Sequence, residues 1–227
     1  MRTHKVEGMS VFFATASIAC FTYSVLALLL LHVLRPDYAP AHHMISDYAV
    51  GPYGWVMTIW FLAMSCGCLM LLLGLVRSGP NTIAARIATL LLGVASIGLV
   101  VSAIFPTDVQ PPSTRTGEIH DMSFLVNIVS ILLAIVLLSV NFGSQPRWRP
   151  YRRTALTLAG LIALAAVLQF LTLHKGAPYG LANRLFVTVL LAWLLATSIR
   201  LRAVAASESV CGCALHGAVP RLPHIGL

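Results

Sequence analysis

Two carboxylates and a histidine lie close together in the sequence, between two long apolar segments. Asp108 ends the motif FPTD, where one apolar segment stops, and His120 and Asp121 open the next segment. Aspartate and histidine are ligands that zinc accepts, and both also serve as general acids and bases. The stretch from Phe105 to Asp121 is therefore the first candidate for a chemical function.

Asp47, Asp108 and His120 are the predicted catalytic residues. In a metal-dependent site, Asp108 and His120 would bind a divalent metal such as zinc, which in catalytic sites has three protein ligands and one open position for water. Their spacing matches no zinc-binding motif, so a metal-free site stays open, with His120 as a general base oriented by Asp108 or Asp47. A third interpretation is structural: a network of helix caps and ion pairs, in which Arg184 neutralises one of the carboxylates.

The sequence gives weaker indications of two other cofactor sites, one for haem and one for a metal bound by cysteine. A haem needs two histidines at similar depth, which His32 and His120 would provide. The motif CGC at 66–68 lies within an apolar segment, where alternate residues face different directions, so packing of small residues explains it better than metal binding. The role of Cys211 and Cys213 stays open, with a cytoplasmic metal cluster as one interpretation.

The composition predicts a protein of the lipid bilayer. Of its 227 residues, 58% are hydrophobic and 10% are charged, against roughly 25% charged residues in an ordinary soluble domain. The formal net charge of +8 would suggest nucleic acid in a soluble protein, but the basic residues lie between apolar segments, where they act as topology signals. We therefore expect the bilayer, and not nucleic acid, as the partner.

Six apolar segments are each long enough, at about 20 residues, to cross the membrane as a helix. We predict an all-α fold, a polytopic bundle of six transmembrane helices at residues 11–200, between a cytoplasmic amino terminus at 1–10 and a loosely ordered cytoplasmic tail at 201–227. The first span is longer than a signal-peptide core, so we expect it to be retained. The predicted spans are Val11–Leu34, Trp55–Val76, Ile87–Phe105, Met122–Asn141, Thr154–Leu173 and Leu185–Ile199, the last of which could begin near Gly180.

Lysine and arginine are distributed unevenly between the two sides of this bundle. One side carries eleven of them and the other carries four, so the positive-inside rule puts both termini in the cytoplasm. We expect the protein in the cytoplasmic (inner) membrane of a prokaryote, with its oligomeric state open. The outer side then collects most of the acidic residues and half of the histidines: Asp37, Asp47, Asp108, Glu118, Asp121, His42, His43, His120 and His174.

A polar stripe, HxxSxxxNxxS, begins at His120 and includes Asn127. Its spacing places the four polar side chains on one face of the fourth predicted helix. That face must meet protein or water, because an unpaired amide is costly in hydrocarbon. In the third predicted helix, Gly98 and Ser102 form a small-xxx-small pattern, which allows a neighbouring helix to approach closely.

Three short motifs resemble a known family. They are SDY followed by GPYGW at residues 46–55, FPTD with a histidine opening the next helix, and GL followed by Arg184. The chain is similar in these motifs to the domain-of-unknown-function 998 family, six-helix membrane proteins of bacteria and archaea, over residues 11–200. The resemblance implies a six-helix integral membrane protein and brings no activity, substrate or catalytic residue with it. It does select the same outer residues as the topology.

The predicted function is that of an outer-leaflet enzyme, a hydrolase or transferase acting on a lipid or lipid-linked substrate. The three catalytic candidates would then act as acid, base or metal ligands, and Ser46, Asn127 and Arg184 would bind substrate. The main alternative is a non-enzymatic membrane protein, either structural or binding a lipid or small molecule. A haem-binding electron carrier and a transporter are further alternatives, although the polar stripe reaches only the outer half of the bundle.

Overall fold

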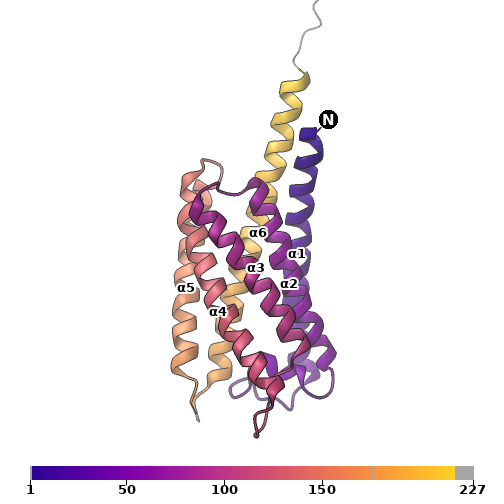
Figure 1. Cartoon of the computed structure of the whole chain (residues 1–227), viewed down its shortest axis with the longest axis vertical. Helices are drawn as coiled ribbons and strands as arrows, with labels where there is room; N and C mark the ends of the chain where they lie inside the picture. The colour runs from indigo at the N-terminus through magenta and orange to yellow at the C-terminus, as the bar shows by residue number, and fades with distance from the viewer. Residues whose placement is uncertain (1, 175, 218–227) are drawn as a thin grey trace, which may run out of the picture.

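Six long helices form the bundle (Figure 1). The computed structural model describes residues 2–174 and 176–217. Within these residues, six helices are long and apolar enough to cross a membrane. The described residues also form three short 3-10 helices. The long helices are α1 (Arg2–Leu34), α2 (Gly54–Ser78), α3 (Ile83–Ile104), α4 (Arg115–Asn141), α5 (Arg152–Leu171) and α6 (Tyr179–Gly217), and the short ones are η1 (Ile45–Ala49), η2 (Phe142–Ser144) and η3 (Arg149–Tyr151).

The all-α fold with six membrane spans is confirmed, and the largest differences from the predicted helix ends are in α1, α4 and α6. Helix α1 begins at Arg2 rather than at Val11. Helix α4 begins at Arg115 rather than at Met122, because Thr114 caps it by accepting a hydrogen bond from the Gly117 amide. Helix α6 begins at Tyr179 and continues to Gly217, into the predicted tail. Residues 218–227 and the side chains of Cys211 and Cys213 lie outside the described residues.

The helices pack in a ring in the order of the sequence, and α6 returns to pack against α1. Connections 35–53, 105–114 and 172–178 meet at one end of the bundle, which we call the acidic end (Figure 1). Connections 79–82 and 142–148 meet at the other, the basic end, where most of the arginines gather. The positive-inside rule assigns the basic end to the cytoplasm, and this orientation stays a prediction.

Polar bonds between neighbouring helices hold the ring together within its apolar interior. Ser65 of α2 and Ser96 of α3 each donate a hydroxyl to the other's backbone carbonyl, at 2.8 and 3.0 Å. The indole of Trp60 in α2 donates to the carbonyl of Ser24 in α1 at 2.9 Å. Such bonds stabilise helix association in lipid, where apolar burial alone gives little preference for protein over lipid.

Glycine allows the closest helix contacts. A Cβ added at Gly67 in α2 would lie 2.6 Å from the ring of Phe21 in α1, which agrees with the packing interpretation of the motif CGC at 66–68. A Cβ added at Gly98 would collide with the side-chain amide of Asn127, so α3 and α4 approach one another where the small-xxx-small pattern predicts.

Aromatic side chains fill the basic half of the bundle. Trp148 is fully buried, stacks on Phe142 with 4.5 Å between ring centroids, and donates its indole N–H to the Ser78 carbonyl at 2.8 Å. Trp193 of α6 is also fully buried and donates to the Ser139 hydroxyl at 3.1 Å. The acidic half is packed differently, because a cavity remains among its helices.

Candidate functional site

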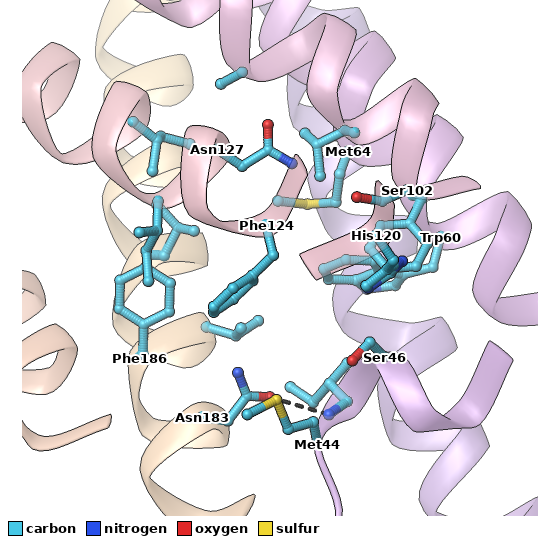
Figure 2. A pocket seen from close by; sticks show the side chains of 18 of the residues that line it. Met44, Ser46, Trp60, Met64, Ser102, His120, Phe124, Asn127, Asn183 and Phe186 are labelled. Carbon is cyan, nitrogen blue, oxygen red and sulfur yellow. Dashed lines mark hydrogen bonds between the residues drawn. The ribbon is translucent and has the colours of Figure 1, made fainter. Parts of the chain in front are cut away.

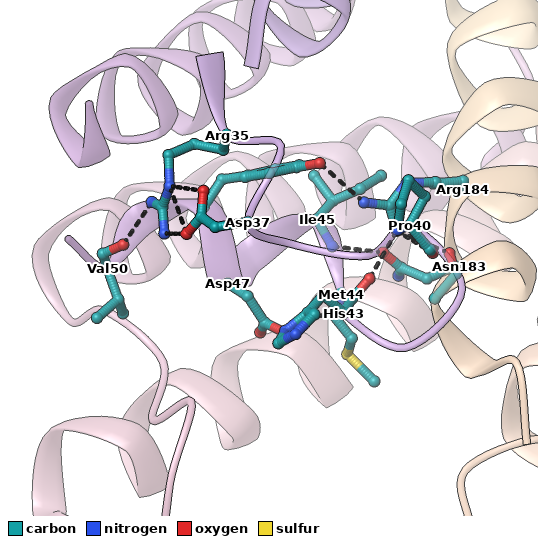
Figure 3. A network of polar contacts seen from close by, with 12 residues as sticks. Arg35, Asp37, Pro40, His43, Met44, Ile45, Asp47, Val50, Asn183 and Arg184 are labelled. Atoms are coloured by element: carbon teal, nitrogen blue, oxygen red, sulfur yellow. Dashed lines mark hydrogen bonds and ion pairs between the residues drawn. The ribbon is translucent and has the colours of Figure 1, made fainter. Parts of the chain in front are cut away.

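Arg184, in the first turns of α6, fastens the loop 35–53 to the bundle (Figure 3). Its Nη1 donates to the carbonyls of Pro40 and His43 at 2.8 and 2.6 Å. Its Nε donates to Nε2 of His32 at 2.7 Å, and its Nη2 donates to the Tyr48 hydroxyl at 3.1 Å. Among the described residues, no carboxylate lies within ion-pair distance of Arg184. Backbone carbonyls and two aromatic side chains therefore take the place of the expected carboxylate.

His32 accepts from Arg184 as a neutral ring. Its Nδ1 lies 2.7 Å from the carbonyl of Leu28, an atom that only accepts, so Nδ1 carries the proton. Nε2 is then left with the lone pair that receives the Arg184 N–H. Both ring nitrogens are occupied in this arrangement, so His32 presents no free nitrogen to a haem.

A second arginine fastens the loop 35–53 from the side of α1. Arg35 is 4% exposed, and its Nη1 donates to the carbonyls of Val50 and Pro52 at 2.8 and 3.1 Å. Its Nη2 also pairs with Asp37 at 2.8 Å, and this bond lowers the pKa of the Asp37 carboxyl. The guanidinium lies 4.0 Å from the centre of the Tyr38 ring. Arg35 thus connects the two ends of the loop, and Arg184 holds its middle.

Asp47 organises the interior of this loop. Its carboxylate accepts from the backbone N–H of Met44 at 2.9 Å, which caps η1, and it lies 3.2 Å from Nδ1 of His43. Burial raises the pKa of Asp47, and the bonds to His43 and Met44 and the charge of Arg184 act in the opposite direction. In this structure Asp47 is bonded to its own loop.

Asp108 belongs to the amino-terminal cap of α4. Its carboxylate accepts from the Thr114 backbone N–H at 2.6 Å and from the Thr114 hydroxyl at 2.9 Å. A Cβ added at Gly117 would collide with the same carboxylate, so the carboxylate and the first turn of α4 are in close contact. Asp108 therefore fixes the point where the helix begins.

Replacing Asp108 with alanine is expected to lower the free energy of unfolding by about 1–2 kcal/mol, because Thr114, the cap residue of α4, loses both of its bonds to the Asp108 carboxylate. Reversible unfolding in mixed micelles, followed by circular dichroism, measures this loss. Asp121→Ala is the matched control, since Asp121 is exposed on the same helix and should change stability by no more than about 0.5 kcal/mol. Equal losses in the two variants would contradict the capping role.

A cavity of about 100 Å³ lies among α2, α3, α4 and α6 in the acidic half of the bundle (Figure 2). Residues 44–46 of the loop 35–53 also line it, so the loop that the two arginines fasten forms part of its wall. Most of the wall is apolar, and Trp60, Phe61, Phe124 and Phe186 are its aromatic members. The polar residues of the wall are Ser46, Ser102, His120, Asn127 and Asn183.

His120 is 4% exposed and lies in the wall of this cavity (Figure 2). Its Nδ1 lies 2.8 Å from the carbonyl of Phe105 and must donate to it. The ring meets Phe61 edge-on, with 5.8 Å between centroids. Among the described residues, none forms a hydrogen bond with Nε2. The neutral ring therefore offers a lone pair to the cavity.

Two amides also contribute to the cavity wall. Asn183 of α6 is 5% exposed, and its Oδ1 accepts from the Ile45 backbone N–H at 3.0 Å, which leaves its Nδ2 as a donor. Oδ1 of Asn127 is buried without a hydrogen-bond partner in the described part of the chain. The hydroxyl of Ser102 lies 2.7 Å from that of Ser123, which donates to the His120 carbonyl at 2.9 Å.

The structure brings some of the predicted site residues together and separates the others. Ser46, His120 and Asn127 line the cavity, whereas Asp47, Asp108 and Arg184 are bonded to surrounding loops and caps. In the described part of the chain, no three His, Cys, Asp or Glu side chains are grouped closely enough to hold a metal ion. Asn183 was not among the predicted site residues. The sequence signal that could have indicated Asn183 is a polar amide next to Arg184 within a mostly apolar helix.

The fold and the cavity together define a multi-pass integral membrane protein with a mostly apolar cavity inside its helix bundle. The chain belongs to the DUF998 family, whose description is "Protein of unknown function (DUF998)", and the match covers residues 12–200. This range includes four of the six spans completely, most of the first and the last span, and both fastening arginines. No curated protein and no solved structure matches the chain significantly.

Proposed function

We propose that this protein binds a lipid or another largely apolar molecule in the cavity among α2, α3, α4 and α6. The observation that supports binding most directly is the cavity itself, because its wall is mostly apolar and contains a small number of polar groups. Ligand sites have this composition: apolar surface provides affinity, and isolated polar groups orient the ligand. With the basic end in the cytoplasm of a prokaryotic inner membrane, the cavity lies at the level of the outer leaflet.

The contacts of the carboxylates favour binding over the metal-dependent and acid–base reactions. Asp108 has both oxygens engaged by Thr114. Asp47 is engaged by its own loop. His120 is oriented by the Phe105 carbonyl, so neither Asp47 nor Asp108 orients it as the predicted carboxylate partner.

A hydrolase or transferase acting on a lipid is the second candidate function. It is favoured by His120, whose Nδ1 is fixed by a carbonyl while its Nε2 is left as a proton acceptor beside the cavity. In such an enzyme, Nε2 would take a proton from a hydroxyl or a water that attacks the substrate. Product formation in reconstituted vesicles, lost in His120→Asn, would support this function in addition to binding.

Photolabelling of the protein in vesicles tests the proposed binding. We expect an alkane that carries a photoactivatable diazirine to label cavity residues such as Met64 and Phe124, which peptide mass spectrometry can locate. Ala95→Phe should suppress this labelling severalfold, because Ala95 is 1% exposed and lines the cavity. Leu90→Phe is the matched control on the same helix, where Leu90 is 72% exposed, and should leave the labelling unchanged.

Two further measurements show whether reduced labelling reflects a filled cavity or an unfolded variant. Ala95→Leu fills less of the cavity and should give an intermediate reduction, and the melting temperature of every variant is measured in the same vesicles. Labelling confined to lipid-facing residues in the wild type would refute the proposed binding, as would equal cavity labelling in the wild type and in a folded Ala95→Phe variant.

A further inference from the structure

We infer that the ligand presents an uncharged group that bears a hydroxyl, and that His120 and Asn183 recognise it. This inference rests on the proposed function and narrows the chemical class of its ligand. It is carried by two polar atoms on different helices, each in a side chain that is more than nine-tenths buried and lines the cavity.

The first atom is Nε2 of His120, which requires a donor. Nδ1 is committed to the Phe105 carbonyl, so the neutral ring has one remaining hydrogen-bonding position, and that position accepts. Among the described residues, none supplies a donor to it. A hydroxyl group supplies the required proton without carrying a charge.

The second atom is Nδ2 of Asn183, which requires an acceptor. The Ile45 backbone N–H can bond only an acceptor, so it fixes the amide oxygen of Asn183 on the loop side and leaves the amide nitrogen as a donor. Figure 2 shows Asn183 and His120 on different sides of the cavity. A hydroxyl, ester or ether oxygen of the ligand satisfies this donor.

The lack of charged residues in the described cavity wall disfavours ionised head groups. The described residues that line the cavity include no Asp, Glu, Lys or Arg, and the nearby guanidinium of Arg184 is committed to carbonyls, His32 and Tyr48. A phosphate or carboxylate would lose its hydration there without gaining a counter-charge. An alcohol or an acylglycerol loses much less, and both have the donor and the acceptor that the wall requires.

A cavity of about 100 Å³ is small for a whole lipid. It compares with the engineered apolar cavity of about 150 Å³ that binds benzene. The inferred occupant is therefore a group of about the size of glycerol. It can belong to the head of a neutral lipid or to a free polyol, and these two sources share the recognised chemistry.

Competition against the diazirine alkane tests this inference on the full-length protein in vesicles. The competitors are lauroyl glycerol, dodecanol, dodecane, laurate and lauryl phosphate, which share one chain length, together with free glycerol. We expect lauroyl glycerol and dodecanol to compete at concentrations at least about tenfold lower than laurate or lauryl phosphate. Competition by glycerol alone, at equal strength to lauroyl glycerol, would support the recognised chemistry and identify a free polyol as its source.

Two variants test the two named atoms. His120→Asn keeps a donor for the Phe105 carbonyl and removes the Nε2 acceptor. Asn183→Leu keeps a similar volume and removes the Nδ2 donor, together with the oxygen that the Ile45 N–H bonds. Each should weaken competition by lauroyl glycerol about tenfold while changing competition by dodecane little. The dodecane measurement reports whether the cavity is still formed.

The outcomes separate this inference from the proposed function. If all competitors displace the probe equally well, the cavity binds alkyl chains without recognising a hydroxyl group. The inference is then overturned, while the proposed function stands. If laurate and lauryl phosphate compete best, a charged ligand is bound and the inference is again overturned. If the cavity residues are never labelled, the proposed function itself fails.

Discussion

Arg184→Met is expected to lower the free energy of unfolding by about 3 kcal/mol, a large fraction of the stability of a typical domain. The methionine has a stem of similar length and no donors. The carbonyls of Pro40 and His43 and the Nε2 atom of His32 would each lose a charged donor near the membrane surface. Hydrogen bonds to charged groups contribute about 1.5–3 kcal/mol each, and bonds that share one side chain do not add fully.

Unfolding in mixed micelles measures this loss, and two further variants make the result specific. Arg184→Lys keeps the charge but not the planar set of donors, so it should recover only part of the stability. Arg115→Met removes an exposed arginine from the same end of the bundle and should cost no more than about 0.5 kcal/mol. Full recovery by lysine would show that charge, rather than the fork of hydrogen bonds, fastens the loop.

Gly180→Ala is expected to be the second most damaging substitution, at about 2–3 kcal/mol. An added Cβ at this position would collide with the carbonyl oxygens of Pro40 and His43. These are backbone atoms, so no side-chain rotation relieves the contact, and the loop 35–53 must move away from α6. The same movement would lengthen the bonds from Arg184, because Arg184 donates to the same two carbonyls.

Gly160→Ala is the matched control for this substitution. An added Cβ at Gly160 meets nothing within 4 Å, and Gly160 lies within α5. Alanine is preferred to glycine inside a helix, so this variant should be unchanged or more stable by up to about 1 kcal/mol. Because Gly180 and Arg184 act on one loop, the double variant Gly180→Ala with Arg184→Met should lose less than the sum of the single losses. A fully additive result would contradict the shared role.

The helices and the direction of the polar stripe could be predicted from the sequence because they depend on local pattern. Apolar length predicts a membrane span, and the spacing after His120 predicts a common face. In the structure, His120 and Ser123 are buried, and Asn127 lines the cavity with His120. The pattern also placed Gly98 and Ser102 against a neighbouring helix, which proves to be α4.

The partners of the charged residues could not be predicted in the same way. A carboxylate beside a membrane has the same sequence signature whether it binds a metal or a backbone N–H. Asp108 bonds Thr114, six residues further on, because the intervening loop turns back, and Asp47 bonds Met44 because η1 begins there. Similarly, Arg184 meets carbonyls whose positions depend on the whole path of the loop 35–53.

Asn183 was missed for a related reason. Its neighbour Arg184 carries the stronger signal, and no periodicity connects position 183 with residues 44–46, which lie far away in the sequence. The Ile45 N–H that fixes its amide becomes available only after the loop 35–53 has reached its final conformation. Long-range contacts of this kind decide which face of an amide points into a cavity.

The ring order of the helices has a consequence for biogenesis. Of these six helices, α6 is synthesised after the other five, yet it packs against α1, the earliest of them in the sequence. It also supplies Asn183 and Phe186 to the cavity and Arg184 to the loop 35–53. Before α6 is inserted, the other five helices lack this part of the cavity wall and this support for the loop. The same helix therefore completes the cavity wall and brings Arg184 to the loop.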